Sequence, residues 1–281
     1  MKYNIYSGAG NDFVMINNFD NIIPENKQAE LTVKICETHF KHIDGVIFID
    51  KPLNKNASLR MNYYNRDGSF GAMCGNGARC TVKYAADNKM LSERSYMLEA
   101  VGILYSAELV SGDLAKIGFP TVSDYKLDVH VELGSDLSLT QLHWMNVGSE
   151  HIMVFTGDIM NPKVNSLDDI KINEWGSLLR FHESFQPKGA NVNFVELIGN
   201  NNIKIRTYER GVEWETLACG TGIISSAITA GLLGLITPPV NVLVQSGETL
   251  IVDYKINGPV VENVSLLGSA KKISEGEIKF E

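Results

Sequence analysis

The sequence predicts an α/β (α+β) protein made of two copies of one unit, and three observations lead to this prediction. Short strand patterns alternate with helix patterns along nearly all of the 281 residues. A Cys-Gly-x-Gly motif occurs twice, in "MCGNGARC" (73–80) and in "ACGTGIIS" (218–225). A stretch without a single charged residue, 216–246, contains the second motif and has the composition of an enclosed helix.

The first half of the chain alternates between strands and helices around a glycine loop, "YSGAGNDF" (6–13). Alternation of Leu59, Met61 and Tyr63 with their neighbours indicates a half-buried strand. The expected strands are 2–5, 13–16, 46–49 and 59–64, and the expected helices are 27–38 and 78–88.

The second half repeats this alternation after several strands within 96–156. An exposed connection follows Asp158. We then expect a helix at 172–181, strands at 192–195 and 203–208, a helix at 222–233, a strand at 241–244 and a strand-rich tail. The uncharged stretch contains glycines and prolines, and its apolar run 222–236 is shorter than the ~20 residues a membrane span requires. We therefore interpret it as a buried helix.

Three pairs of similar segments support an internal duplication. Cys74 lies 145 residues before Cys219. "YNRDG" (64–68) precedes the first motif as "YERG" (208–211) precedes the second, and "GNDFVM" (10–15) resembles "GSEHIM" (148–153). Two copies of one unit can pair about a pseudo-twofold axis, which would bring both cysteines to one interface.

Composition restricts the class of function. The chain is long enough for two domains, and its net charge of −8 argues against nucleic acid or an anionic membrane as the main partner. Four cysteines are too few for a disulfide scaffold, and the N-terminus lacks the apolar core of a signal peptide, so we expect a cytoplasmic protein. His39 and His42 have metal-ligand spacing but no third ligand is apparent, and no nucleotide loop or PLP-lysine signature occurs. We expect neither metal nor cofactor.

The two motifs suit proton transfer beside a carboxylate. Glycines after a cysteine allow a ligand to approach the backbone, and the N–H groups at a helix start favour negative charge. A helix N-terminus also lowers the pKa of a cysteine thiol. One cysteine can then remove an α-proton as thiolate while the other donates a proton from the opposite face. Backbone donors at Gly75, Asn76, Gly220 and Thr221 would stabilise the carbanion.

Four segments resemble the diaminopimelate epimerase family of cofactor-independent amino-acid racemases. They are "GAGNDF" (8–13), "NRDGSFGAMCGNGARC" (65–80), "GANVNFV" (189–195) and "ERGVEWETLACGTG" (209–222). The resemblance implies two halves, 1–119 with the returning tail 264–281 and 120–263, each a β-barrel-like sheet around a central helix, with the active site between them. It also implies PLP-independent interconversion of LL- and meso-2,6-diaminopimelate, in lysine and peptidoglycan precursor biosynthesis. The expected partner is this small molecule, and a homodimer is left open.

The resemblance also assigns residues. Cys74 and Cys219 match the two catalytic cysteines, and His151 and Glu209 match groups that assist them. The matched substrate-binding residues are Asn11, Asn65 and Asn191, the pair Glu209 and Arg210 at the distal end, and Gly75, Asn76, Gly220 and Thr221 at the near carboxylate. Cys36 and Cys80 are expected to be packing residues.

The sequence departs from the family pattern in four places. "KHIDG" (41–45) replaces a glycine-rich Gly-Ile-Gly-Ala-Asp-Gly, and "GSEH" (148–151) replaces Gly-Asn-Pro-His, so that Ser149 stands where an asparagine is usual. "ERGVEWET" (209–216) contains one extra residue, with Trp214 inside it. "LGSA" (267–270) replaces Thr-Gly-Pro-Ala.

Three alternative functions fit parts of the pattern. A related racemase of another amino acid would keep both cysteines and change the distal pocket. A cysteine hydrolase would use one cysteine with a histidine and tolerate loss of Cys219. A non-catalytic carboxylate-binding protein would tolerate loss of both sulfurs.

Overall fold

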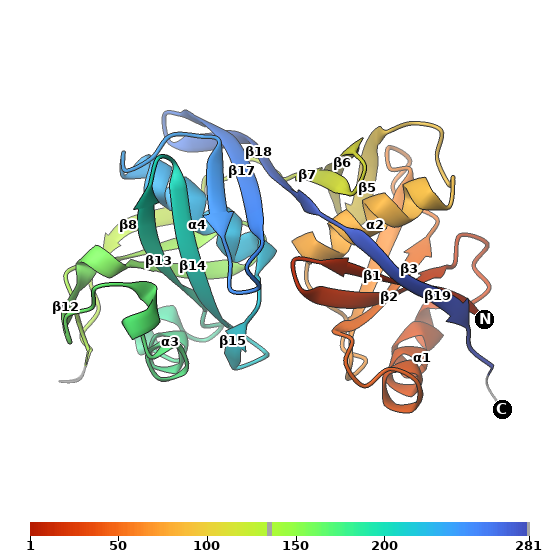
Figure 1. Ribbon diagram of the computed structural model, residues 1–281, viewed down its shortest axis with the longest axis horizontal. Helices are drawn as coiled ribbons and strands as arrows, with labels where there is room; N and C mark the ends of the chain where they lie inside the picture. The colour runs from red at the N-terminus through yellow and green to blue at the C-terminus, as the bar shows by residue number, and fades with distance from the viewer. Residues whose placement is uncertain (134–136, 280–281) are drawn as a thin grey trace. The chain divides into compact units, whose positions relative to one another are not determined.

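The computed structural model describes residues 1–133 and 137–279 and divides into two compact units. Unit 1 comprises Met1–Gly118 and Leu267–Glu281, and unit 2 comprises Phe119–Leu266. Strands and helices alternate in both, which confirms the expected α/β class (Figure 1).

Unit 1 is a sheet wrapped around one helix. Its strands are β1 (Lys2–Gly8), β2 (Asn11–Asn17), β3 (Gly45–Asp50), β4 (Leu59–Asn65), β5 (Ser95–Ala100), β6 (Ile103–Ser111), β7 (Leu114–Gly118) and β19 (Lys271–Glu277). They pair in the order β19-β1-β2-β3-β4-β5-β6-β7. β7 also pairs with β18 (Val260–Ser269), which leads through Ala270 into β19 and closes the sheet.

The enclosed helix is α2 (Gly75–Asp87), and it contacts β1, β2, β3, β4, β6, β7 and β19. Its residues from Gly75 to Val82 are all buried, because strands surround them (Figure 1). A second helix, α1 (Glu25–Thr38), packs on β3 and β4.

Unit 2 repeats this plan. Its strands are β8 (Tyr125–Val129), β9 (Ser138–Leu139), β10 (Leu142–Asn146), β11 (Glu150–Phe155), β12 (Ile159–Asn161), β13 (Asn191–Gly199), β14 (Asn202–Glu209), β15 (Trp214–Thr216), β16 (Val240–Leu243) and β17 (Thr249–Asn257). The main sheet runs β8-β10-β11-β13-β14-β16-β17-β18. Val122, just before β8, pairs with Val261 of β18 and brings the ends of this sheet together.

The helix enclosed by this second sheet is α4 (Gly220–Leu232), which contacts β10, β11, β13, β14, β16 and β17. Every residue from Gly220 to Ala230 is buried, which confirms the enclosed helix expected from the uncharged stretch. Among the described residues, no helix is long and apolar enough to cross a membrane. Outside the sheet, α3 (Ile172–Arg180) packs on β13, β14 and β15. Three short 3-10 helices complete the unit, η1 (Thr156–Asp158), η2 (Leu167–Asp169) and η3 (Glu183–Phe185).

The pairing pattern reveals the duplication directly. β2 runs parallel to β3, β3 antiparallel to β4, and β4 parallel to β5. In the same order, β11 runs parallel to β13, β13 antiparallel to β14, and β14 parallel to β16. The register also matches, since Phe13 lies opposite Gly45 and His151 opposite Asn191. Equivalent positions can therefore be assigned residue by residue.

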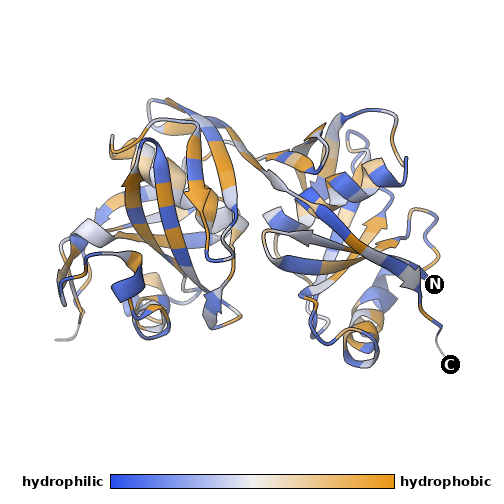
Figure 2. Cartoon of the chain, viewed as in Figure 1, coloured by the Kyte–Doolittle hydropathy of each residue, from blue (hydrophilic) through white to orange (hydrophobic). Residues whose placement is uncertain are grey.

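Two details differ from the sequence expectations. The enclosed helices begin at Gly75 and Gly220, directly after the cysteines, and not at 78 and 222. The alternation expected in β4 ends after Met61, because Asn62 and Tyr64 are buried whereas Tyr63 is only partly buried, and the Asn62 amide donates to the Asp50 carboxylate at 2.8 Å. In β14 apolar and polar residues alternate, as its striping shows (Figure 2), whereas β3 is buried along its whole length.

Candidate functional site: two equivalent cysteine half-sites

The first half-site is the N-terminus of α2. Cys74 is the N-cap residue with φ −102° and ψ 106°, and its Sγ accepts a hydrogen bond from the Gly77 N–H at 3.4 Å. The first intrahelical bond runs from Ala78 N–H to the Cys74 carbonyl. The N–H groups of Gly75 and Asn76 precede it and have no intrahelical acceptor. Both groups directly follow the cysteine at the start of the helix.

The second half-site is the N-terminus of α4 and has the same backbone. Cys219 is the N-cap residue with φ −116° and ψ 111°, and Ile223 N–H donates to its carbonyl. The N–H groups of Gly220 and Thr221 therefore occupy the same positions as those of Gly75 and Asn76. Cys219 is buried, and its Sγ lies 3.5 Å from Thr221 Oγ1.

The second glycine of each motif allows the helix to pack closely on a strand. A Cβ at Gly77 would lie 2.8 Å from Ile47 Cδ1 of β3, and a Cβ at Gly222 would lie 2.3 Å from Asn193 Oδ1 of β13. A Cβ would therefore displace the end of the Ile47 side chain at the first position, and at the second it would displace Asn193, which hydrogen bonds hold in place. In both units the second glycine of the Cys-Gly-x-Gly motif therefore lies in close contact with an equivalent strand, β3 or β13.

A chain of amides supports the first half-site. Arg79 Nη2 donates to Asn76 Oδ1 at 3.0 Å, and Asn76 Nδ2 donates to Asn11 Oδ1 at 2.6 Å. Asn11 Nδ2 then donates to Asp44 Oδ1 at 3.0 Å, while the second carboxylate oxygen of Asp44 accepts from Asp12 N–H. Each amide has its oxygen toward the guanidinium and its nitrogen toward the carboxylate. The two asparagines matched to substrate binding are therefore fixed in orientation by charges at both ends.

Hydroxyls and an imidazole support the second half-site. His151 Nε2 lies 2.9 Å from both Ser149 Oγ and Thr221 Oγ1. Ser149 Oγ donates to Thr221 Oγ1 at 3.1 Å. Behind the ring, Asn193 Nδ2 lies 3.1 Å from His151 Nδ1. The structure thus joins the predicted residues His151, Thr221 and Cys219 in one network.

The imidazole in this network is neutral. Burial lowers the pKa of His151 to about 3, and the positive charge of Arg210 acts in the same direction. Asn193 fixes the tautomer, because its Nδ2 also donates to the Ile152 carbonyl and its Oδ1 accepts from Thr207 Oγ1. Nδ1 is consequently the acceptor, and Nε2 carries the proton.

The predicted distal residues lie at the end of β14. Arg210 Nη1 bonds to the Glu150 carboxylate at 2.9 Å and to the Gly189 carbonyl at 3.1 Å, and Arg210 N–H donates to Asn191 Oδ1. Burial raises the pKa of Glu150, but hydrogen bonds from Lys188 and Arg210 outweigh this and hold it below its usual value. Arg210 is therefore already part of an ion pair within unit 2.

The remaining predicted residues occupy the two turns that follow equivalent strands. Asn65 ends β4, and its Nδ2 donates to Ser69 Oγ at 2.9 Å. Glu209 ends β14, and its Oε2 accepts from Thr216 Oγ1 at 3.0 Å. Trp214 of the longer motif pairs with Glu209 at the start of β15 and is 61% exposed. The extra residue therefore lengthens a turn beside Glu209.

Sequence reasoning missed three residues of these networks, namely Asp44, Arg79 and Asn193. Each lies inside a segment quoted above, "KHIDG", "MCGNGARC" and "GANVNFV". The available signal was chemical, because a buried charge or amide in an apolar environment requires a partner. Arg79 and Asn193 are both fully buried.

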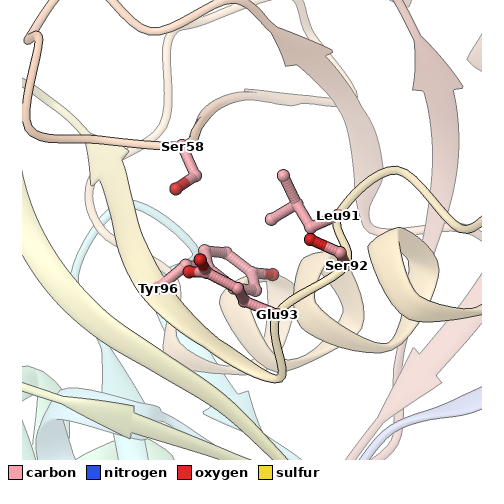
Figure 3. A pocket seen from close by; sticks show the side chains of 5 residues that line it. All are labelled: Ser58, Leu91, Ser92, Glu93 and Tyr96. Atoms are coloured by element: carbon pink, nitrogen blue, oxygen red, sulfur yellow. The ribbon is translucent and has the colours of Figure 1, made fainter.

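The other two cysteines and the residues that line a hollow in unit 1 are not among the predicted site residues. Cys36 and Cys80 are buried in unit 1, and burial raises the pKa of the Cys36 thiol. A hollow of about 190 Å³ lies in unit 1, lined by Ser58, Leu91, Ser92, Glu93 and Tyr96 (Figure 3). In the part of the chain that the structure describes, no group of three metal-ligating side chains occurs.

Comparisons with known proteins agree with this arrangement. The family model for diaminopimelate epimerase matches residues 3–108 and 143–273. A diaminopimelate epimerase of Hydrogenobaculum sp. (strain Y04AAS1) is 34% identical over 286 residues, covering 98% of both chains. One of Methanocella arvoryzae is 36% identical over 288 residues, covering 99% of this chain and 96% of its own.

Solved structures share the fold at low sequence identity. A hydroxyproline epimerase from Agrobacterium vitis has a TM-score of 0.72 at 15% identity and covers 98% of this chain and 91% of its own. A PhzF-family phenazine biosynthesis protein from Bacillus anthracis has a TM-score of 0.69 at 12% identity, covering 100% of this chain and 99% of its own. These structures show the fold, whereas the family model and the relatives that are 34% and 36% identical over nearly the whole length show that the chain belongs to the diaminopimelate epimerase family.

Proposed function

We propose that this protein is a PLP-independent epimerase that interconverts LL- and meso-2,6-diaminopimelate by two-base proton transfer. The observation that carries the proposal is the pair of equivalent N-cap cysteines, Cys74 and Cys219, each followed by two backbone donors without an intrahelical acceptor. The choice of diaminopimelate as the substrate is based on membership of the family. The metabolic role is that of the family, in lysine and peptidoglycan precursor biosynthesis, in the cytoplasm.

The reaction moves one proton on each side of the α-carbon. Cys219, as thiolate, removes the α-proton from one face, and Cys74, as thiol, gives its proton to the opposite face. The reverse reaction exchanges these roles. Efficient transfer needs groups whose pKa lies near the working pH, and a thiol at a helix N-terminus meets this requirement.

The α-proton is a weak acid, so the carbanion requires stabilisation as it forms. Its charge spreads into the substrate carboxylate, which the N–H groups of Gly75, Asn76, Gly220 and Thr221 would hold. Each preorganised donor of this kind is worth about 3–4 kcal/mol in the transition state. The protein's own groups are thereby sufficient for the chemistry, and the proposed reaction uses no metal or cofactor.

The distal end of the substrate would be held by Arg210 and Glu209, with Asn65, Asn191 and the fixed amide of Asn11. A guanidinium accommodates a carboxylate with two parallel hydrogen bonds. Because Arg210 already pairs with Glu150, a substrate carboxylate would share this guanidinium. Ser149 and Trp214 distinguish the region from the usual family pattern, so the choice of amino acid is the part of the proposal to test first.

The test is incubation in deuterated water with LL-diaminopimelate, meso-diaminopimelate and a panel of monocarboxylic amino acids, with α-deuterium read by NMR. We expect α-deuterium in diaminopimelate only, and loss of epimerisation in Cys74→Ala and Cys219→Ala proteins. Arg210→Ala should reduce activity at least about tenfold, and Arg210→Lys should rescue little, because lysine lacks the planar fork. Exchange confined to a monocarboxylic amino acid, unaffected by Arg210→Ala, would identify a related racemase.

A further inference from the structure

We propose that Thr221 is a positioning residue whose hydroxyl accepts a hydrogen bond from neutral His151 and donates one to Cys219 Sγ, holding that sulfur as the thiolate. This inference deepens the proposed function, since it assigns the resting base to one of the two cysteines. It concerns the Thr221 side chain and is separate from the role of its backbone N–H.

The direction of the hydrogen bonds follows from their fixed ends. Asn193 Nδ2 donates to the Ile152 carbonyl and to His151 Nδ1, so the ring must donate from Nε2. The acceptors within 2.9 Å of Nε2 are the hydroxyls of Ser149 and Thr221. Asn191 Nδ2, at 3.4 Å, is itself a donor that binds the Glu150 carbonyl.

Thr221 then has one hydrogen left to give. Its oxygen accepts from His151 and from Ser149 Oγ–H at 3.1 Å, so its own O–H is directed to another acceptor. Cys219 Sγ lies 3.5 Å away, a normal O–H···S separation. A thiolate is a far better acceptor than a thiol, so this bond favours the ionised sulfur.

The charged groups near this network do not provide another way to stabilise the Cys219 thiolate. Glu150 and His151 lie on β11, and Glu209 and Arg210 end β14. Glu150 is compensated by Arg210 and Lys188, and His151 stays neutral because of its burial. On β10, His143 lies two residues from Met145, the partner of His151, and accepts from Asp128 N–H.

At the equivalent positions of unit 1, assigned from the strand register, the residues do not form a counterpart of the hydrogen bonds from His151 to Thr221 and from Thr221 to Cys219. The position of His151 is Phe13, that of Asn193 is Ile47, and that of Thr221 is Asn76. Asn76 directs its amide to Asn11 and Arg79. Cys74 Sγ accepts instead from a backbone N–H. A hydroxyl-mediated bond to the sulfur is therefore expected to affect Cys219 alone.

The test is the pH dependence of alkylation by iodoacetamide, read separately for Cys219 and Cys74 by peptide mass spectrometry. Thr221→Val removes the hydroxyl and keeps the shape, and we expect the Cys219 midpoint to rise by about one to two pH units. The Cys74 midpoint should not move. Thr221→Ser keeps a hydroxyl and should retain the wild-type midpoint.

Thr229→Val is the matched control, because Thr229 lies on the same helix with a buried hydroxyl that has no hydrogen-bond partner. It should leave both midpoints unchanged. If Thr221→Val does not fold, as judged by circular dichroism, Thr221→Ala provides the same test without placing a methyl group in the polar network. An unchanged Cys219 midpoint in the folded variant, or an equal shift at Cys74, would overturn the proposal.

Activity gives a second readout. The acid limb of the kcat/KM profile should move upward with the Cys219 midpoint in Thr221→Val and return in Thr221→Ser. A purely structural role would lower the rate and leave this limb in place. Because alkylation needs no substrate, its result stands whether or not diaminopimelate is turned over, so failure of the inference and failure of the proposed function are distinguishable.

Discussion

The two cysteine half-sites share a backbone and differ in every side chain that supports them. Both cysteines cap an enclosed helix that a glycine presses against an equivalent strand. In unit 1 the positions beside that contact are apolar, Phe13 and Ile47, whereas in unit 2 they are polar, His151 and Asn193. Duplication has therefore kept the donor geometry and changed the electrostatics around the sulfur.

The supporting networks differ in the same way. In unit 1 fixed charges, Arg79 and Asp44, terminate a chain of amides that can point in one direction only. In unit 2 hydroxyls and a neutral ring form the network, and an O–H can rotate between acceptors. The rigid network suits holding a ligand, and the adjustable one suits a sulfur that changes its charge during the reaction.

The largest expected effect comes from removing either sulfur. Cys74→Ala and Cys219→Ala should each reduce epimerisation by about a thousandfold or more, because a positioned acid or base contributes roughly 10²–10⁴. With one base left, α-deuterium exchange should survive from one stereoisomer only, and from opposite stereoisomers in the two variants. The measurement is NMR of LL- and meso-diaminopimelate in deuterated water.

Cys36→Ala is the control, since Cys36 is buried in α1 and far along the sequence from either motif. It should retain most of the activity. Equal loss in all three variants would contradict the assignment of two bases.

Much of the fold was accessible from the sequence because its signals are local. The repeated motif and the uncharged stretch predicted two copies and an enclosed helix, and α4 confirms this. The helix starts were placed two to three residues late, because glycine lowers helix propensity although here it allows the helix to pack closely on a strand. The asparagine in β4 looked like an exposed residue, but its partner Asp50 is buried with it.

The networks behind the cysteines were less accessible. His151 was found through its match to the family, but its neutral state depends on burial and on Asn193, which lies on another strand. Asp44 and Arg79 are 35 residues apart, and only the fold joins them through two amides. Contacts between residues so far apart in the chain leave no periodic pattern in the sequence from which they could be predicted.

Replacing Arg79 breaks the rigid network at its charged end. Arg79→Met keeps most of the length of the side chain but removes the guanidinium that donates to Asn76 Oδ1 and adds a second bond to the Gly75 carbonyl, so we expect a loss of about 2–4 kcal/mol in the free energy of unfolding. The equivalent residue in unit 2 is Ile224, which is also fully buried, and Ile224→Val should cost only about 1 kcal/mol. Urea unfolding measures both. If Arg79→Met were more stable than wild type, the Arg79 guanidinium would not be required to stabilise the chain of amides.

His151→Phe gives unit 2 the residue of unit 1 and changes the pH dependence of stability. The pKa of His151 is about 3 in the folded protein and near 6.5 when unfolded, so the unfolded chain binds the proton first. The stability that neutral His151 provides is complete above about pH 6.5 and is lost as pH falls toward 3, by up to about 1.4 kcal/mol per pH unit. The variant lacks this loss, so its deficit against wild type at pH 7.5 should shrink at pH 4.5. Parallel stability curves would mean that His151 is not buried as a neutral base.

The smallest effect is expected from Ser149→Asn, which gives unit 2 the counterpart of Asn11 and restores the usual family residue. Asparagine Oδ1 can share the His151 Nε2–H with Thr221 as Ser149 Oγ does, and Nδ2 can donate to Thr221 Oγ1 in place of the serine hydroxyl. The bond from His151 to Thr221 is unaffected, so the support of Cys219 persists. We therefore expect kcat/KM for diaminopimelate to change by less than about threefold, and the alkylation midpoint of Cys219 to stay in place. Ser149→Ala is the matched comparison, because it removes the same hydroxyl without supplying an amide. A gain of tenfold or more in Ser149→Asn alone would show that the serine has moved this protein away from diaminopimelate, toward a different amino acid.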